Sequence, residues 1–149
     1  MLVSDVATDR ASQLAVRLGA EVVAPEHVLD TKCDVYAPCA TGGTLSAETI
    51  PRLRCRVVAG SANNQLGEPA DAERLAERGI LYAPDFVINA GGVFYNGGIE
   101  ALGWDEARVE RALEGIGETL TEIYERSAAE GISTGRAAEA LAESRLAAA

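Results

Sequence analysis

The sequence has few residues of the kinds that bind metals, form disulfides or contact nucleic acids. Among 149 residues there are one histidine and three cysteines, Cys33, Cys39 and Cys55, and no two cysteines stand at C-x-x-C spacing. This pattern predicts reduced, packed thiols and no metal centre. Lysine and arginine total 13 against 23 acidic residues, which gives a net charge of −10. Because nucleic-acid binding needs clustered positive charge, we expect no nucleic-acid partner.

Long apolar runs are also missing. No stretch approaches the roughly 18 residues that a transmembrane helix requires. The first five residues lack the basic region and the long apolar stretch of a signal peptide. We therefore expect a cytoplasmic chain with no membrane partner. Residues 1–149 contain no linker, repeat or low-complexity segment, so they are expected to form one domain with its own core.

A third absence is the G-x-G-x-x-G turn between a strand and a helix. The paired glycines at 42–43, 91–92 and 97–98 have a different spacing, and none lies between a first strand and its helix. In dinucleotide-binding proteins that turn places backbone N–H groups and a helix N-terminus against the pyrophosphate. Its absence predicts that dinucleotide binding is weakened or lost.

Three short runs share one pattern, an apolar segment that breaks into glycine, asparagine or proline. They are residues 33–43 (CDVYAPCATGG), 59–66 (AGSANNQL) and 82–92 (YAPDFVINAGG). Buried parallel strands have this pattern when their carboxyl ends open into ligand-facing loops. Three such breaks predict one shared crevice at the strand ends, which would take a small molecule.

The remaining residues alternate predicted strands and helices. Strands are expected at 2–6, 20–24, 33–37, 54–60 and 80–83, and helices at 8–18, 71–78, 104–130 and 133–146. Gly97 and Gly98 make a helix less favourable between residues 93 and 102. The long helix carries one apolar stripe, formed by Val109, Ala112, Leu113, Ile116, Leu120, Ile123 and Tyr124.

The three runs resemble the C-terminal nucleotide-binding domain of the glutamate/leucine/phenylalanine/valine dehydrogenase family, above all its leucine and valine branch. The resemblance extends from Met1 to about Leu146. The family's chain carries a substrate domain and the Gly-rich turn before the matching part, so we expect a truncated domain. The resemblance implies an α/β fold, an incomplete Rossmann-like parallel sheet with flanking helices and a long C-terminal helix.

The resemblance also implies that the central strand of the sheet is missing. Its two neighbours would then expose unpaired N–H and C=O groups. Either these two strands close up directly, or another chain fills the gap. We expect an oligomer, formed with a second copy or with a separately encoded front half, that is, a chain that carries the missing substrate domain and Gly-rich turn.

The resemblance implies a site for NAD, weakened or lost here. Asp5 stands where the family places the acid that binds the adenosine ribose. An alternative is that Asp5 caps the following helix, or that Thr8 does so while Asp5 is solvated. Cys39 and Ala40 lie in the loop that passes over the adenosine side of the cofactor.

On the nicotinamide side the resemblance implies that Ala62 and Asn64 approach the ribose and the ring. Asn89 would lie near the nicotinamide and the substrate. Arg136 stands where the branched-chain enzymes line the substrate pocket with an apolar side chain. In a pocket, its guanidinium would favour a carboxylate or a phosphate, and the alternative is that it points to solvent. No metal is implied.

Three functions remain open. The first is a truncated or diverged relative of the NAD-dependent branched-chain amino-acid dehydrogenases, unable to carry out oxidative deamination alone. The family's catalytic lysines belong to the missing domain, and the single lysine, Lys32, precedes a strand at the end away from the crevice. The second is a redox-neutral cyclase, dehydratase or isomerase that acts on a small imine, keto or amino-acid-like molecule. The third is a non-catalytic interaction module. Candidate acids and bases for the second are His27, Tyr36, Tyr82, Asp85, Tyr95 and Glu100.

Overall fold

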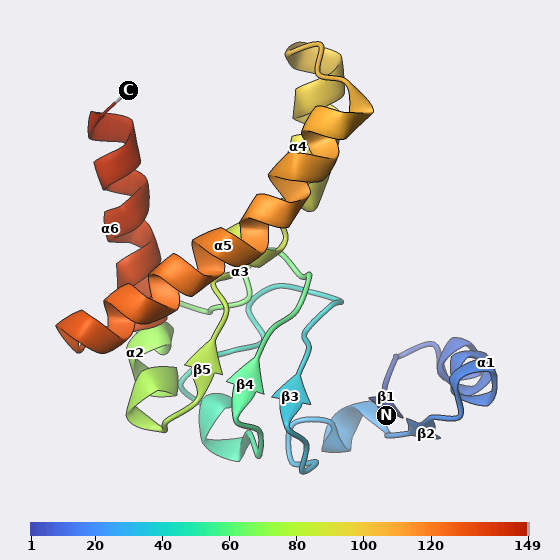
Figure 1. Ribbon diagram of the computed structural model, residues 1–149. Coiled ribbons are helices and arrows are strands. Elements are labelled where there is room, and N and C mark those ends of the chain that lie inside the picture. The colour runs from blue at the N-terminus through green and yellow to red at the C-terminus, as the bar shows by residue number, and fades with distance from the viewer. Residues whose placement is uncertain (149) are drawn as a thin grey trace.

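The computed structural model describes residues 1–148 and contains two separate parallel sheets. Strand β1 (Leu2–Val3) pairs with β2 (Glu21–Val22). Strands β3 (Val35–Tyr36), β4 (Val57–Val58) and β5 (Leu81–Tyr82) form the second sheet in that order (Figure 1). The predicted α/β class, with an incomplete parallel sheet and flanking helices, is confirmed.

The regular strands are shorter than the predicted ones, although the extended segments continue beyond them. Before β3, the N–H of Cys33 donates to the carbonyl of Arg54 at 3.3 Å. After β3, the carbonyl of Pro38 accepts from the N–H of Ala62 at 3.0 Å. The apolar pattern therefore predicted the position of each strand correctly. The regular hydrogen-bond ladder is shorter, because only a few residues of each strand have a partner in register.

The N-terminal unit (residues 1–23) consists of β1, β2 and α1 (Thr8–Leu18). As predicted, α1 ends at Gly19, which adopts a left-handed conformation with φ of 60°. The helix packs on its own two strands through Ala11 and Ala15, and these are the only fully buried residues of the unit. The N-terminal unit therefore has a very small core.

The main core lies beneath the three-stranded sheet. Helix α2 (Asp71–Glu77) packs on β5, and the 3-10 helix Ile50–Arg52 packs on α2. Another 3-10 helix, Pro25–His27, follows β2 and leads towards β3. The large buried side chains of this core are Leu45, Ile50, Leu53, Val58, Leu75, Ile80 and Tyr82.

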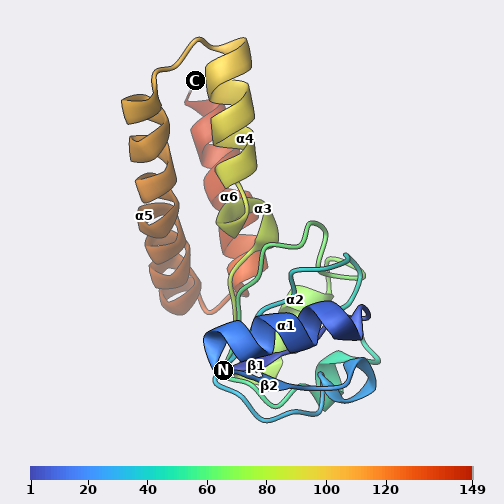
Figure 2. The same cartoon turned by 90° about the vertical axis from the view of Figure 1, so that its right-hand side faces the viewer.

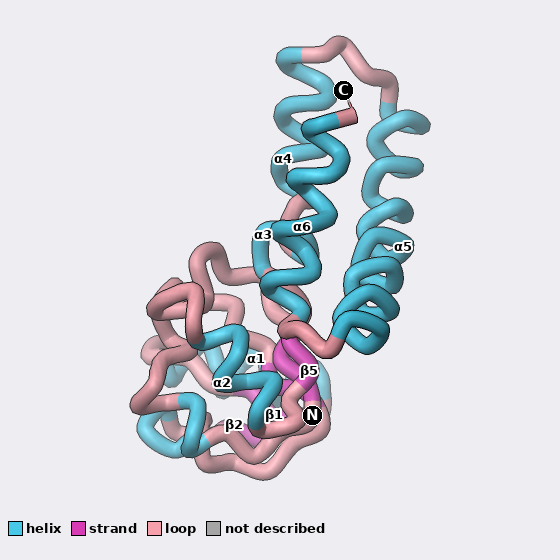
Figure 3. Tube along the Cα trace, turned by 90° about the vertical axis from the view of Figure 1, so that its left-hand side faces the viewer, coloured by secondary structure: helices cyan, strands magenta, loops and turns pink. Residues whose placement is uncertain are grey.

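After β5 the chain forms a helical arm that extends away from the sheets (Figures 1, 2 and 3). It comprises α3 (Asp85–Ile88), α4 (Gly91–Asn96), a π-helix (Gly97–Ala101), α5 (Glu106–Glu130) and α6 (Thr134–Ala147). The long helix begins after Asp105, whose carboxylate accepts from the N–H of Arg108 at 2.8 Å. Residues from α3, α5 and α6 form a second core, with Ile123, Ala137, Ala138 and Leu141 at its centre. The predicted helices at 104–130 and 133–146 are therefore confirmed.

The expectation that two glycines disfavour a helix near residue 97 is wrong. The chain stays helical from Gly91 to Ala101, with a π-helical last turn. Gly98 is buried under the ring of Trp104, and a Cβ atom at Gly98 would lie 2.7 Å from Cε3 of that ring. The N–H of Trp104 also donates to the carbonyl of Gly98 at 2.8 Å. Tertiary packing thus overrides the low helix propensity of glycine.

The gap between the two sheets remains open in residues 1–148, because β1 and β3 share no ladder. Of the two alternatives for the gap, direct closure of these two strands is therefore not what the structure shows. No helix in the described part of the chain combines the length and apolar character needed to cross a bilayer.

Candidate functional site

The loops after β3, β4 and β5 meet at one edge of the sheet. The N–H of Gly43 donates to the carbonyl of Asn64 at 2.7 Å. The side-chain amide of Asn89 donates to Oδ1 of Asn63 at 2.5 Å and to the carbonyl of Ala62 at 3.4 Å. We call Asn63, Asn64 and Asn89 the amide cluster. The three loops that the sequence singled out are therefore neighbours.

The small residues in these loops allow one loop to approach another. A Cβ atom at Gly42 would lie 2.6 Å from the carbonyl oxygen of Asn63 and 2.7 Å from that of Asn64. Gly60 approaches the backbone of Pro38 in the same way. Asn64 itself has a positive φ of 51°, a left-handed conformation that asparagine tolerates better than most residues. The loop backbone is thus held in one specific conformation.

Two buried polar residues, Gln65 and Asp85, hold the loop after β4, which carries Asn63 and Asn64, through hydrogen bonds. The side-chain amide of Gln65 donates to the carbonyls of Gly60 at 2.8 Å and Ala62 at 2.9 Å. Its backbone N–H donates to Oδ2 of Asp85 at 2.9 Å, and Oδ1 accepts from the N–H of Phe86 at 2.9 Å. Neither residue was predicted from the sequence as a support for this loop; the amide next to the two asparagines was the signal that could have indicated Gln65.

Tyr82 completes this support. Its hydroxyl oxygen accepts from the N–H of Asp85 at 3.1 Å, and its ring lies in the main core. Burial raises the pKa of Tyr82 above the normal value of a phenol, so the hydroxyl stays neutral. Both Tyr82 and Asp85 are therefore engaged in holding the loop at the carboxyl end of β5.

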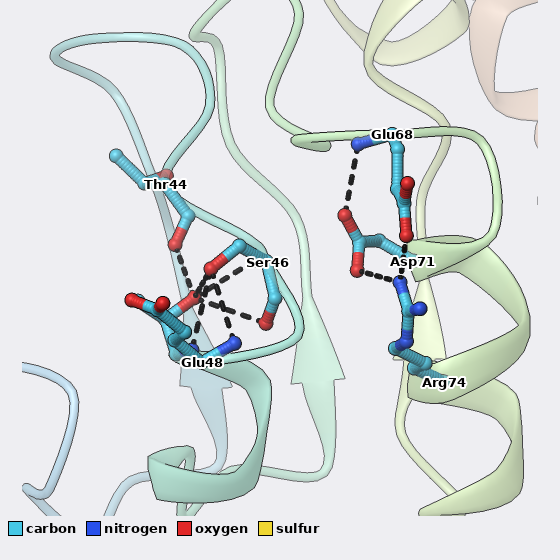
Figure 4. A network of polar contacts seen from close by, with 7 residues as sticks. Thr44, Ser46, Glu48, Glu68, Asp71 and Arg74 are labelled. Carbon is cyan, nitrogen blue, oxygen red and sulfur yellow. Dashed lines mark hydrogen bonds and ion pairs between the residues drawn. The ribbon is translucent and has the colours of Figure 1, made fainter.

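The loops after β3 and β4 are also joined to each other at their C-terminal ends. Leu45 and Leu66 form an isolated parallel bridge. Beside it, Oδ2 of the buried Asp71 accepts from the N–H of Glu68 at 2.9 Å, and Arg74 binds Oδ1 at 2.7 Å (Figure 4). Because its charge is paired and hydrogen-bonded, Asp71 can be buried at the start of α2.

Asp5, Cys39 and Ala40 line a largely apolar cavity of about 840 Å³ between the two sheets. Oδ1 of Asp5 accepts from the N–H of Ala7 at 2.7 Å. Ala7 is the N-cap residue of α1 and the helix has no side-chain cap, so neither Asp5 nor Thr8 caps it. Lys32 lines the same cavity, whereas Asn64 and Asn89 do not. The residues expected at the two ends of NAD therefore occupy different places on the molecule.

The three cysteines are free thiols, and only Cys39 is exposed. Burial is the main cause that raises the pKa of Cys33 and of Cys55 above the usual thiol value. Within residues 1–148 no group of three histidine, cysteine or acidic side chains is arranged to hold a metal ion.

Arg136 is exposed and lines a second cavity of about 440 Å³. Asn64 lines this cavity too, and Glu73 and Glu139 add negative charge to it. Asn89 does not line it, so the two residues expected in one substrate pocket lie in different surroundings.

Comparisons with known proteins agree with this fold. The L-tryptophan dehydrogenase of Nostoc punctiforme has a crystal structure that matches 99% of this chain with a TM-score of 0.92 and 42% sequence identity, and the match covers 45% of that chain. A hetero-hexameric glutamate dehydrogenase from Thermus thermophilus shares the fold with a TM-score of 0.68 at 21% identity, over 97% of this chain and 45% of that one.

Relatives of known activity match by sequence as well. The leucine dehydrogenase of Thermoactinomyces intermedius is 44% identical over 146 residues, which are 98% of this chain and 40% of that protein. The valine dehydrogenase of Streptomyces albus is 47% identical over 114 residues, which are 76% of this chain and 31% of that protein. The chain thus spans well under half the length of these relatives. Residues 3–149 match the profile of the glutamate/leucine/phenylalanine/valine dehydrogenases, and the chain belongs to this family.

Proposed function

We propose that this chain forms the rear part of the nucleotide-binding domain of an NAD-dependent branched-chain amino-acid dehydrogenase and does not deaminate amino acids alone. The observation that carries the proposal is the amide cluster at the carboxyl ends of β4 and β5. Its loop is held by the buried Gln65 and Asp85, while Asn63 and Asn64 are exposed. Exposed amides in a fixed conformation suit the carboxamide and ribose groups of a nicotinamide nucleotide.

The residues present fit the two ends of NAD better than its middle. Asp5, Cys39 and Ala40 line the cavity on the proposed adenosine side. Ala62, Asn64 and Asn89 would contact the nicotinamide side. NAD, when bound, supplies the hydride acceptor of the family's reaction. Nothing in the sequence provides the Gly-rich turn for the pyrophosphate, so we propose that binding is weak.

We further propose that Asn89 and Arg136 act on the substrate side. The Arg136 guanidinium in its cavity would pair with a carboxylate or another anion. Groups that activate water and hold the amino acid would have to come from outside residues 1–149, since the only lysine lines the other cavity.

An assembly is part of the proposal, either a homo-oligomer or a complex with a separately encoded front half. The open edges of β1 and β3 support it, because unpaired strand edges attract partners. Light scattering would test it, and a mass of 15.6 kDa in every preparation would contradict it. The cytoplasmic location expected from the sequence also belongs to the proposal.

Calorimetric titration of the purified chain with NADH tests the proposed function. We expect weak, saturable binding of one NADH per chain, which Asn89→Ala weakens further because it removes the amide bonded to Asn63. The matched control is Asn96→Ala, in which an exposed asparagine of α4 is replaced. Absence of binding at millimolar NADH would refute the proposal and leave the redox-neutral enzyme and the interaction module as the alternatives.

A further inference from the structure

Two of the three cysteines, Cys33 and Cys55, lie on neighbouring strands at the same register position. Strands β3 and β4 pair in parallel with Val35 opposite Val57. Continuing this register towards the N-terminus places Cys33 opposite Cys55. The N–H of Cys33 donates to the carbonyl of Arg54 at 3.3 Å, which is the bond that a residue opposite position 55 makes in a parallel ladder.

The two strands stay joined between these cysteines and the regular ladder. The carbonyl of Asp34 accepts from the N–H groups of Arg56 and Val57, each at 3.1 Å. The side chains of Asp34 and Arg56 also form an exposed ion pair at 3.7 Å. Neighbouring strands of a sheet lie about 4.8 Å apart. Because the Cα atoms of two disulfide-bonded cysteines are roughly 4.4–6.8 Å apart, the pairing brings Cys33 and Cys55 within the range of a disulfide.

The two thiols also share one environment. Both are free and half-buried. Cys55 and Tyr36 pack against the main core, and burial, followed by negative charge on Cys55 and Cys33, raises the pKa of Tyr36. Burial also raises the pKa of Cys55, and negative charge on Cys33 adds to this effect. This electrostatic coupling agrees with the short distance that the register predicts.

The two thiols differ in their access to solvent. Cys33 lines the cavity of about 840 Å³ and Cys55 does not, so a small oxidant reaches Cys33 first. Besides burial, the Asp34 carboxylate raises the pKa of Cys33, whereas backbone hydrogen bonds and the charge of Arg78 act in the opposite direction on Cys55. Cys39 is exposed, but it follows β3 and is not opposite Cys55 in the register.

We propose that Cys33 and Cys55 form a redox site, which a peroxide oxidises to an intrachain disulfide between β3 and β4. With hydrogen peroxide, the Cys33 thiolate attacks one oxygen, the O–O bond breaks, hydroxide leaves, and Cys33 becomes a sulfenic acid. The Cys55 thiolate then attacks the Cys33 sulfur, the S–O bond breaks, and the hydroxyl group leaves with a proton as water. The two thiols together lose two electrons and two protons, and the peroxide is reduced to two molecules of water.

The disulfide would stabilise the main core. It closes the segment from Cys33 to Cys55, which contains Leu45, Ile50 and Leu53 of that core. A cross-link that closes such a loop lowers the conformational entropy of the unfolded chain. The effect is reversible, since a thiol reductant reopens the bond. The inference does not depend on the proposed function, because neither a nicotinamide nor an amino acid takes part in the reaction.

The test uses Cys39→Ser, which removes the exposed thiol and leaves the pair. The reduced protein is treated with hydrogen peroxide at a pH of about 8.5, because burial lowers the thiolate fraction of both cysteines at neutral pH. We expect both thiols to disappear together with a loss of about 2 Da in mass. Trypsin cleaves after lysine and arginine, so the disulfide would join residues 33–52 to residues 55–56, and dithiothreitol would separate them. Oxygen added to either cysteine without a cross-link, a cross-link between two chains, or two thiols that stay titratable would each overturn the proposal.

The matched control is the double variant Cys33→Ser/Cys39→Ser, in which Cys55 has no partner thiol. We expect peroxide to consume the Cys55 thiol at least about tenfold more slowly than in Cys39→Ser, and equal rates would overturn the pairing. Urea denaturation measures the effect on stability. The midpoint should rise on oxidation of Cys39→Ser and stay unchanged in the peroxide-treated double variant. Absence of a rise in the cross-linked protein would overturn the stabilising effect.

Discussion

Gly97 and Gly98 provide a matched test of the packing between the π-helix and the start of α5. At Gly98, a Cβ atom would lie 2.7 Å from Cε3 and 3.1 Å from Cδ2 of the Trp104 ring. At Gly97, no heavy atom lies within 4 Å of the added carbon, and its φ of −66° suits alanine. The same substitution at neighbouring positions therefore removes equal chain entropy from the unfolded state but has opposite consequences for packing.

The expected magnitudes follow from these contacts. Gly97→Ala should stabilise the protein by about 0.5–1 kcal/mol, the usual gain for alanine over glycine in a helix. Gly98→Ala has the same gain, but the added methyl group overpacks the Trp104 ring, which costs about 1–3 kcal/mol. The net effect of Gly98→Ala is a destabilisation of up to about 2.5 kcal/mol.

Urea denaturation of the two variants gives the measurement. Trp104 is the only tryptophan, so its fluorescence reports on this site, and circular dichroism follows the whole chain. Arg108 lies over the ring, 4.4 Å from its centroid, so a displaced ring should also change its emission in the folded state. If Gly98→Ala stabilised the protein as much as Gly97→Ala, with unchanged emission, the packing of Gly98 against Trp104 would be refuted.

Two further predictions concern the loops of the candidate site. Asp85→Ala leaves the N–H groups of Gln65 and Phe86 without their acceptor, so we expect a loss of about 2–4 kcal/mol in the free energy of unfolding. The control is Asp34→Ala, which removes an exposed ion pair at 3.7 Å to Arg56 and should cost less than about 0.5 kcal/mol. Similar losses of stability in the two variants would contradict the role of Asp85 in supporting the loop. At neutral pH a thiol reagent should label the exposed Cys39 first, because burial raises the pKa of Cys33 and Cys55 and lowers their thiolate fraction. Labelling of Cys33 and Cys55 should accelerate as the pH rises towards their pKa values. A fast labelling phase that survives in Cys39→Ser would contradict the prediction that Cys39 reacts first.

Local signals in the sequence were sufficient for most elements and for the family. Gly19 and Gly131 end helices in the left-handed conformation, and Ser133 caps the last helix through a bond from the N–H of Arg136 at 3.3 Å. These features depend on backbone geometry within a few residues, which sequence patterns capture well. The glycine, asparagine and proline residues that follow three apolar segments likewise predicted the loops that lie together in the structure.

Only the tertiary structure decided the features that depend on contacts between residues far apart in the sequence. The helix through Gly98 exists because the Trp104 ring packs on it. The support of the amide loop by Asp85 joins residues 20 positions apart, and no local pattern distinguishes such an acid from a turn residue. Arg136 lines the second cavity, whereas the side-chain amide of Asn89, just after α3, donates to Asn63 and Ala62. The resemblance implied a gap in the sheet, but only the structure shows that β1 and β3 do not close up directly, since periodicity predicts a strand but not which strand lies beside it.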